Sequence, residues 1–296
     1  MSWKEFRRGL RIRVLLLALP LLRRLPHRAA VALGAAVGTL AWFVVGGERR
    51  RAVEGLQMAF PEASDGWRRK TGRQSFANLG RAALELAIAD RVPLRERVLL
   101  DEASEALLRA AHAKGHGVVF VACHVGNWEL LARRIALLGI PCGTVAREAQ
   151  DPRLTALLEA ARRDAGVRVL WRGAPGLAKE MLRLLREGGL LGLLIDQDTD
   201  VQGHFVPFFG KPAFTPRAAG DLAVRAEAPV VMGCVHRVAP TVHRVVLRPI
   251  EVVRSGDREA DSFAITAAAT LAIEAEVRSR PDEWVWMHRR WRTQAP

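Results

Sequence analysis

A histidine and a glutamate stand five residues apart in the stretch "FVACHVGNWELLARRI", residues 120–135. His124 follows a short apolar run, and Glu129 lies where apolar residues take up helical spacing. A carboxylate that accepts the proton of one imidazole nitrogen fixes the tautomer and leaves the other nitrogen free as a base. Such a pair suits a reaction in which a hydroxyl group loses its proton.

The same two residues also have a structural explanation. His124 can cap the start of a helix, and Glu129 can be a solvated acid in its first turn. On one regular helix this spacing would place the side chains on different faces, so they meet only if His124 lies in the loop before the helix. The spacing alone leaves both explanations open.

The segments around the motif alternate between strand and helix patterns. The run "VVFVAC" at 118–123 is short and rich in branched residues, which is typical of a buried strand. Further strands are predicted at 142–147, 167–170 and 190–196, and the intervening segments have helical patterns. This order predicts an α/β fold with a largely parallel sheet. His124 then lies at the carboxyl end of a strand, where such sheets bind ligands.

The last third of the chain has a more mixed pattern. Helices are predicted at 214–227 and 261–280, and two strands are predicted between them, at 229–238 and 243–253. Near the start of the chain, Ser64 or Asp65 is expected to cap a long helix.

The N-terminus carries an uncharged run, "AAVALGAAVGTLAWFVVGG", over the nineteen residues 29–47. A helix of that length would be about 28 Å long, close to the thickness of the hydrocarbon core of a bilayer. The run leads into "ERRR" and not into a cleavage site, which favours an anchor over a signal peptide. We expect residues 1–48 to form a basic segment with a membrane helix, and residues 49–296 to form the catalytic domain. The richness in Gly and Ala also fits a helix that is buried or lies on the membrane.

The excess of basic residues indicates which class of molecule the protein binds. Lys and Arg number 45 against 31 acidic residues, a formal charge of +14, which attracts anions such as phospholipid headgroups or an acidic carrier protein. No module or aromatic and basic stripe for nucleic acid is present in the sequence. The three cysteines lack metal-ligand spacing, so buried thiols, no metal and no cofactor are expected.

Several blocks of sequence resemble one family. "HVGNWEL" resembles the first block, H-x4-D/E, of the lysophospholipid acyltransferase superfamily. Its Glu and its Gly-Asn-Trp resemble the branch of lipid A biosynthesis acyltransferases, the late lauroyl and myristoyl transferases. "GLLIDQDTDVQGHFVPFFGKPAFTP" at 192–216 and "RPDEWVWMHRRWRT" at 280–293 are similar to later blocks of that family. The resemblance covers roughly residues 10–293. It implies a mixed, largely parallel sheet flanked by helices, like that of glycerol-3-phosphate acyltransferase, with an N-terminal membrane helix.

The resemblance also implies roles for three residues in catalysis. His124 would be the general base that takes the proton of an acceptor hydroxyl, and Glu129 would orient and charge-balance its ring. Arg162 matches the arginine of a family helix, beside the thioester or the acceptor phosphate. Arg163 is adjacent, and only spacing favours Arg162 for that position.

Substrate-binding roles are implied for a second group of residues. Asp196 and Gln197 match an acidic turn that shapes the floor of the site. Arg147 would bind a phosphate. Arg163 and Asn127 are also expected to bind substrate.

The implied function is transfer of a fatty acyl group from an acyl carrier protein thioester to a hydroxyl of a phosphorylated lipid A precursor. The implied location is the cytoplasmic face of the bacterial inner membrane. Two alternatives stay open. One is an acyltransferase of the same superfamily that acts on a mannosylated phosphatidylinositol, an ornithine lipid or a lysophospholipid. The other is a non-catalytic basic protein that binds anionic lipid.

Overall fold

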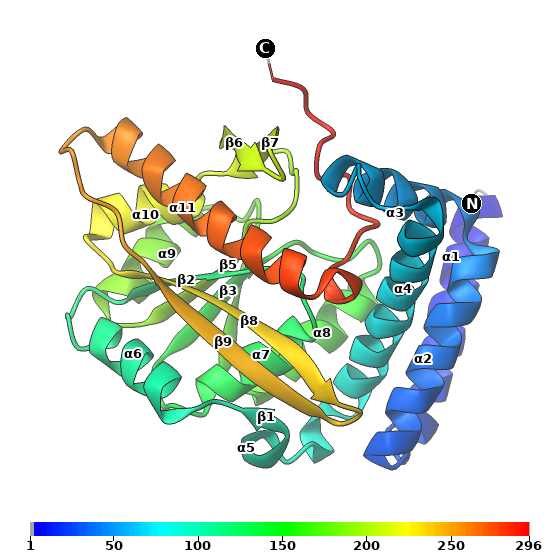
Figure 1. The fold of residues 1–296 in the computed structure, drawn as a ribbon. Helices are drawn as coiled ribbons and strands as arrows, with labels where there is room; N and C mark the ends of the chain where they lie inside the picture. The colour runs from blue at the N-terminus through cyan, green and yellow to red at the C-terminus, as the bar shows by residue number, and fades with distance from the viewer. Residues whose placement is uncertain (1–2, 296) are drawn as a thin grey trace.

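The computed structural model describes residues 3–295 and combines one central sheet with helices on both of its faces (Figure 1). The sheet has seven strands in the order β1-β9-β8-β2-β5-β3-β4. In chain order these strands are β1 (Val98–Leu99), β2 (Val118–Ala122), β3 (Cys142–Ala146), β4 (Val167–Trp171), β5 (Leu190–Leu194), β8 (Val230–Ala239) and β9 (Val242–Ile250).

The sheet is mixed and largely parallel, as the sequence predicts. Strand β2 runs parallel to both of its neighbours, β5 and β8, and β3 runs parallel to β4 and β5. The antiparallel pair is β8 with β9, which a short turn connects. Parallel strands bring their carboxyl ends to one edge, so the loops after β2, β3 and β5 meet there.

Apolar side chains on the two faces of the sheet form two cores. Val119 and Val121 of β2 point into one core, and Val118 and Phe120 point into the other. Burial on both faces explains why the strands read as continuous apolar runs. The helices that cover the sheet are α6 (Glu102–His112), α7 (Trp128–Ala136), α8 (Pro152–Asp164), α9 (Leu177–Arg186), α10 (Ala218–Ala226) and α11 (Arg258–Ser279). The short elements are η1 (Ala89–Arg91), α5 (Leu94–Arg97) and η2 (Pro281–Glu283).

A separate hairpin corrects one sequence expectation. The helix predicted from residue 214 begins only at Ala218, because the residues before it form β7 (Lys211–Pro216). This strand pairs with β6 (Gly203–Phe208), and the rings of Phe205 and Phe214 lie across the hairpin with centroids 5.3 Å apart. Cross-strand aromatic pairs of this kind stabilise a hairpin.

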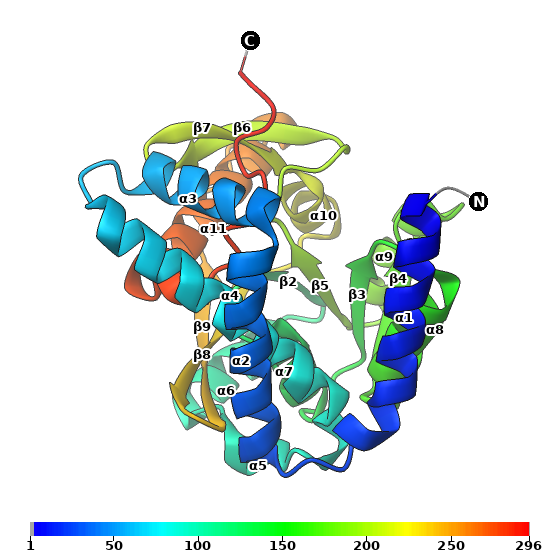
Figure 2. The ribbon, with the colours of Figure 1, turned by 90° about the vertical axis from the view of Figure 1, so that its right-hand side faces the viewer.

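Four helices form the N-terminal part: α1 (Trp3–Leu22), α2 (His27–Val44), α3 (Gly46–Ala59) and α4 (Asp65–Ala87). Figure 2 looks onto this side of the molecule, with α1 and α2 in front. Ser64 caps α4 by accepting from the backbone N–H of Trp67, as predicted. Helix α2 has 18 residues and a mean hydropathy of 1.3, long and apolar enough to cross a membrane. The domain boundary expected at residue 48 falls inside α3.

Candidate active site

His124 meets Asp196 where two neighbouring strands end. The register of β2 and β5 pairs Ala122 with Leu194, so the residues two places farther along both chains also face each other. The His124 ring nitrogen Nδ1 lies 2.8 Å from Oδ1 of Asp196, and the His124 backbone N–H donates to Oδ2 over 2.7 Å. The sheet itself therefore aligns the imidazole with a carboxylate.

Asp196 is held as a buried anion. Its carboxylate also accepts from the indole Nε1–H of Trp284 over 2.7 Å. Burial opposes ionisation of Asp196, but the nearby His124 ring and the hydrogen bonds from His124 outweigh it and hold the carboxyl pKa well below its ordinary value. A charged Asp196 accepts the Nδ1 proton of His124 and leaves Nε2 as the basic nitrogen.

Glu129 does not contact His124 as expected. Its carboxylate accepts two hydrogen bonds from Arg162, over 2.5 Å to Nη2 and 3.1 Å to Nε. Glu129 lies in the first turn of α7, from where it reaches α8, whereas the ladder between β2 and β5 places Asp196 directly beside the imidazole. Glu129 therefore pairs with Arg162, and Asp196 occupies the position beside His124 that was expected for Glu129.

Three side chains surround the His124 ring. The side-chain amide of Gln197 lies 3.1 Å from Nε2 of His124 and 2.8 Å from Nε2 of His288. The His288 ring lies edge-on to His124 at 4.7 Å between centroids, and the Trp128 ring lies on another side at 4.8 Å. Burial, with a smaller effect of His124, lowers the pKa of His288 to about 4, so His288 is neutral at physiological pH.

A cavity of about 930 Å³ opens beside this cluster. Its polar lining includes His124, Glu129, Arg162 and Gln197. Apolar side chains from β2, α7, α8, β4 and α9 form much of the remaining wall, among them Phe120, Leu131, Ile135, Leu158, Trp171, Leu177 and Met181. The cavity thus joins a charged end that holds the histidine to walls that suit a hydrocarbon chain.

The other predicted substrate-binding residues differ in position. Arg147 follows β3 and lines the cavity. Arg163 does not line it: its side chain is 73% exposed and pairs with Asp164. Asn127 is buried, caps α7 by accepting from the Leu130 backbone N–H, and donates to a carboxylate of α4. Asn127 therefore caps a helix, and of the two neighbouring arginines Arg162 lines the cavity while Arg163 does not.

Two residues at the site were not predicted from the sequence. Trp284 and His288 belong to the C-terminal "RPDEWVWMHRRWRT" block, which returns to the sheet beside β2. The backbone N–H of Val285 donates to the carbonyl of His124, which fixes this return. The many aromatic and basic residues in this block indicated that it could be functional, but they did not predict where the segment lies in the fold.

The pairing of Glu129 with Arg162 leads to a first prediction. Glu129→Gln should lower turnover by about tenfold, equivalent to about 1.4 kcal/mol, because the amide keeps one hydrogen bond to Arg162 but loses the charge. Arg162→Ala should also lower turnover, and the two losses should not be additive in the double variant. Steady-state rates of the two single variants and the double variant test this. Losses that simply multiply in the double variant would show that the two residues act independently.

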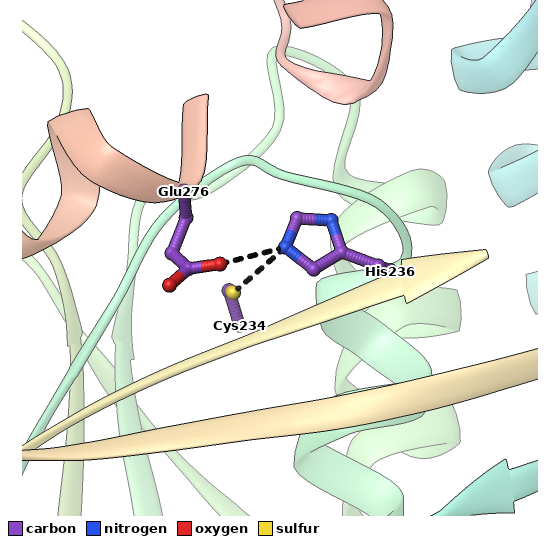
Figure 3. Close-up of side chains that lie close together, drawn as sticks. All are labelled: Cys234, His236 and Glu276. Carbon is purple, nitrogen blue, oxygen red and sulfur yellow. Dashed lines mark hydrogen bonds and ion pairs between the residues drawn. The ribbon is translucent and has the colours of Figure 1, made fainter. Parts of the chain in front are cut away.

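A second polar cluster lies in the core, and its residues do not line the cavity (Figure 3). His236 of β8 directs Nε2 at Glu276 over 2.9 Å and at the sulfur of Cys234 over 3.6 Å, and directs Nδ1 at Glu283 over 3.1 Å. Burial alone would lower the pKa of His236, but its hydrogen bonds with Cys234 and to the carboxylates of Glu276 and Glu283 raise it to about 11. Arg248 pairs with the other oxygen of Glu276.

Cys234, His236 and Glu276 have the donor types of a metal site, but the protonation of the cluster does not suit one. Metal binding requires a deprotonated imidazole nitrogen. Here each ring nitrogen faces a carboxylate, which fits an imidazolium that donates on both sides. We interpret the cluster as a structural ion network that joins β8, α11 and η2.

This interpretation predicts a stability effect. His236→Phe should lower the free energy of unfolding by about 3 kcal/mol or more, because two buried carboxylates lose their partner. Since the folded pKa lies above the unfolded value of about 6.5, the contribution of His236 is complete below that pH and declines as pH rises toward 11. Thermal unfolding of wild type and variant measures both effects. Zinc or a chelator should leave the wild-type midpoint unchanged, and a zinc-dependent rise would contradict the ion network.

Comparison with known proteins shows to which family this chain belongs. The model of the bacterial lipid A biosynthesis acyltransferases matches residues 7–293. The chain is 24% identical over 274 residues to the lipid A biosynthesis lauroyltransferase of Escherichia coli K12, covering 91% of this chain and 87% of that protein. It is 23% identical to the palmitoleoyltransferase of that strain over the same shares of both chains, and 25% identical to its myristoyltransferase over 84% of this chain and 76% of that protein. The chain therefore belongs to the bacterial lipid A biosynthesis acyltransferase family.

Proposed function

We propose that this protein transfers a fatty acyl group from an acyl carrier protein thioester to a free hydroxyl of a phosphorylated lipid A precursor, with His124 as general base. The observation that carries the proposal is the alignment of His124 with buried Asp196 at the charged end of the cavity. The activities in the names of the relatives support the lipid A acceptor.

In this mechanism the proton moves from the acceptor hydroxyl to His124 and then to the departing thiolate. Nε2 of His124 takes the proton of the acceptor hydroxyl as its oxygen attacks the thioester carbonyl, and a tetrahedral oxyanion forms. The C–S bond then breaks, the thiolate of the carrier leaves, and the His124 imidazolium returns the proton to it. Asp196 holds the ring and balances its positive charge during both steps.

Gln197 holds the basic nitrogen before substrate arrives. Its amide lies within hydrogen-bond distance of Nε2 on both His124 and His288, and Gln197 itself lines the cavity. An acceptor hydroxyl that reaches His124 takes over this hydrogen bond, while neutral His288 still offers Gln197 an acceptor nitrogen. The glutamine thus keeps the imidazole in place without adding charge.

Arginines of the cavity suit an acceptor that carries phosphates. Arg147 and Arg172 line it. Arg162, held by Glu129, offers a third cation near the histidine. Planar guanidinium groups bind phosphate oxygens in a bidentate way, so these residues provide anchors for the phosphorylated headgroup. The apolar walls then receive the acyl chain.

The donor can be tested through salt dependence. An acidic carrier protein should be drawn to a chain of formal charge +14, so its rate of productive association should fall as ionic strength rises. We expect the specificity constant for the acyl carrier protein thioester to drop at least tenfold between low salt and about 0.5 M salt, the range over which surface charges become screened. Acyl-coenzyme A serves as the comparison donor. Equal rates for the two donors at both salt concentrations would argue against carrier protein as the donor.

The acceptor is tested in cells, where we place the protein at the cytoplasmic face of the inner membrane. Lipid A and phospholipids from cells with and without the gene are compared by mass spectrometry. Loss of one acyl increment from lipid A alone is the expected result. An unchanged lipid A together with a changed phospholipid, ornithine lipid or phosphatidylinositol mannoside would move the function to that acceptor.

A further inference from the structure

Helix α2 is joined to α4 by backbone contact along its middle. A Cβ atom on Gly34 would collide with the carbonyl oxygen of Gly80, and one on Gly80 would collide with the carbonyl oxygen of Gly34. A Cβ on Gly38 would meet the carbonyl oxygen of Phe76 in the same way. Only glycine allows two helices to approach this closely. The order of these contacts shows that α2 and α4 run antiparallel.

Both ends of α2 are also fixed to α4. Near its start, Nε2 of His27 lies 3.0 Å from the fully buried carboxylate of Glu85. Near its end, buried Trp42 packs edge-on against Phe76 at 5.3 Å between centroids, inside the larger core. Glu85 in turn binds Arg237 of β8, so the helix pair is tied to the central sheet.

This attachment conflicts with a transmembrane path for α2. If α2 crossed the bilayer with its present contacts, α4 would enter the hydrocarbon beside it. Charged side chains occur in α4 on both sides of its contact with the middle of α2, namely Asp65, Arg68, Arg69, Lys70, Arg73, Arg81 and Glu85. Each would cost about 2.5–3.5 kcal/mol or more at the centre of a bilayer. If α2 left α4 instead, Trp42 and Phe76 would lose their place in the core and Glu85 would lose His27.

The opposite face of α2 is apolar and exposed. Residues at helical spacing form an apolar stripe along it: Leu33, Val37, Leu40, Phe43 and Val44, which are between 41% and 72% exposed. Leu17 and Leu21 of α1 are exposed as well. Contiguous exposed apolar surface of this kind marks an interaction site. Exposed arginines flank the stripe at positions 13, 23, 24 and 28.

We infer that α2 lies along the surface of an anionic phospholipid bilayer, with the apolar stripe at the boundary between headgroups and acyl chains, and does not cross it. The combination of one apolar face, flanking arginines and a high positive charge matches a helix bound at such an interface. The buried face of α2 stays packed on α4. Both ends of α2 then remain on the side of the membrane that holds the catalytic domain.

Labelling from one side of the membrane tests this geometry. Arg24→Cys and Gly47→Cys place single exposed thiols before and after α2 in the full-length protein. The three native cysteines are buried, so unmodified protein gives the background. A membrane-impermeant maleimide is added to inverted inner-membrane vesicles and to spheroplasts, with detergent-treated samples as the reference for full labelling. We expect both positions to react in the inverted vesicles and neither in spheroplasts. Reaction of the two positions from opposite sides would overturn the inference.

A charge on the apolar stripe tests its contact with lipid. Leu40→Glu should reduce binding of purified full-length protein to phosphatidylglycerol vesicles by at least tenfold, or about 1.4 kcal/mol. Leu271→Glu on α11 is the matched control, because Leu271 is 65% exposed against 63% for Leu40. We expect it to bind within twofold of wild type, and all three proteins to bind phosphatidylcholine vesicles more weakly.

Two results would contradict lipid contact by the stripe. One is Leu40→Glu protein that binds phosphatidylglycerol vesicles as tightly as wild type. The other is a Leu40→Glu substitution that turns a dimer into a monomer in sedimentation while vesicle binding persists, since the stripe would then be an interface between two copies of the chain. Neither readout depends on acyl transfer, so failure here leaves the proposed reaction intact.

Discussion

Asp196→Asn is expected to lower turnover by about a hundredfold or more, the scale of a lost general base. Asparagine fits the space of the aspartate, but its amide group donates to Nδ1 of His124 as readily as it accepts. A donated hydrogen bond moves the proton to Nε2, the nitrogen that must accept the substrate proton, and the imidazolium loses its counter-charge. Acyl transfer per folded molecule, with folding checked by thermal melt, measures the effect.

Asp198 provides the matched control for this substitution. It is an aspartate two residues farther along whose side chain is also buried, but its carboxylate accepts from Arg292 and Thr293 and not from His124. Asp198→Asn should therefore lose some stability while the folded fraction keeps most of its turnover. The assignment of Asp196 would be wrong if Asp196→Asn worked normally while Glu129→Gln lost a hundredfold.

His124→Ala is expected to lose at least as much turnover as Asp196→Asn, because it removes the base itself. The double variant should be little worse than the worse single variant, since residues that act as one unit are not additive. Rates are compared per folded molecule, so that any loss of stability is separated from loss of chemistry.

If His124 has only a structural role, a different result is expected for His124→Ala. There the histidine caps a helix, and its loss costs about 1 kcal/mol of stability without changing the turnover of folded protein. The cap of α7 is in fact Asn127, which accepts from the backbone N–H of Leu130. Asn127→Ala should therefore destabilise the protein as a lost cap does, and folded His124→Ala that worked at the wild-type rate would refute the base assignment.

The sequence predicted the strand positions well because β2, β3, β4 and β5 are short apolar runs with helices between them. The position of His124 at a strand end followed from the same pattern. The sequence pattern did not predict the partner of His124. The H-x4-E spacing suggests Glu129 as the nearby acid, whereas pairing with Asp196 depends on the order of the strands in the sheet. Two runs that end in His124 and Asp196 were visible, but only the sheet shows that they are neighbours.

The C-terminal residues were harder to place for a similar reason. Trp284 and His288 reach the site because residues after α11 turn back across the end of β2 and form a bridge from Val125 to Trp284. A contact between segments so far apart in the chain leaves no periodic signal in the sequence. Asn127, which was counted with the substrate-binding residues, caps α7, because a residue beside a catalytic motif can equally serve as a helix cap.

The apolar run at 29–47 shows the limit of composition. Its length and lack of charge fit a membrane span, and α2 keeps those properties. Gly34 and Gly38 have a local meaning that hydropathy does not record, because they let α2 contact the backbone of α4. Which face of a helix is already occupied depends on tertiary contacts, so composition alone does not separate a helix that spans the membrane from one that lies on it.

The most direct test of the central claim is a mass measurement of the purified reaction. Full-length protein, wild type or His124→Ala, is mixed with an acyl carrier protein thioester and a phosphorylated glucosamine disaccharide lipid that bears free hydroxyls. With wild type, the acceptor should gain the mass of one acyl group for each carrier thiol released, and folded His124→Ala should leave the acceptor unchanged over the same time. Release of free fatty acid with no gain in acceptor mass, or full acylation by the alanine variant, would contradict transfer by a His124 base.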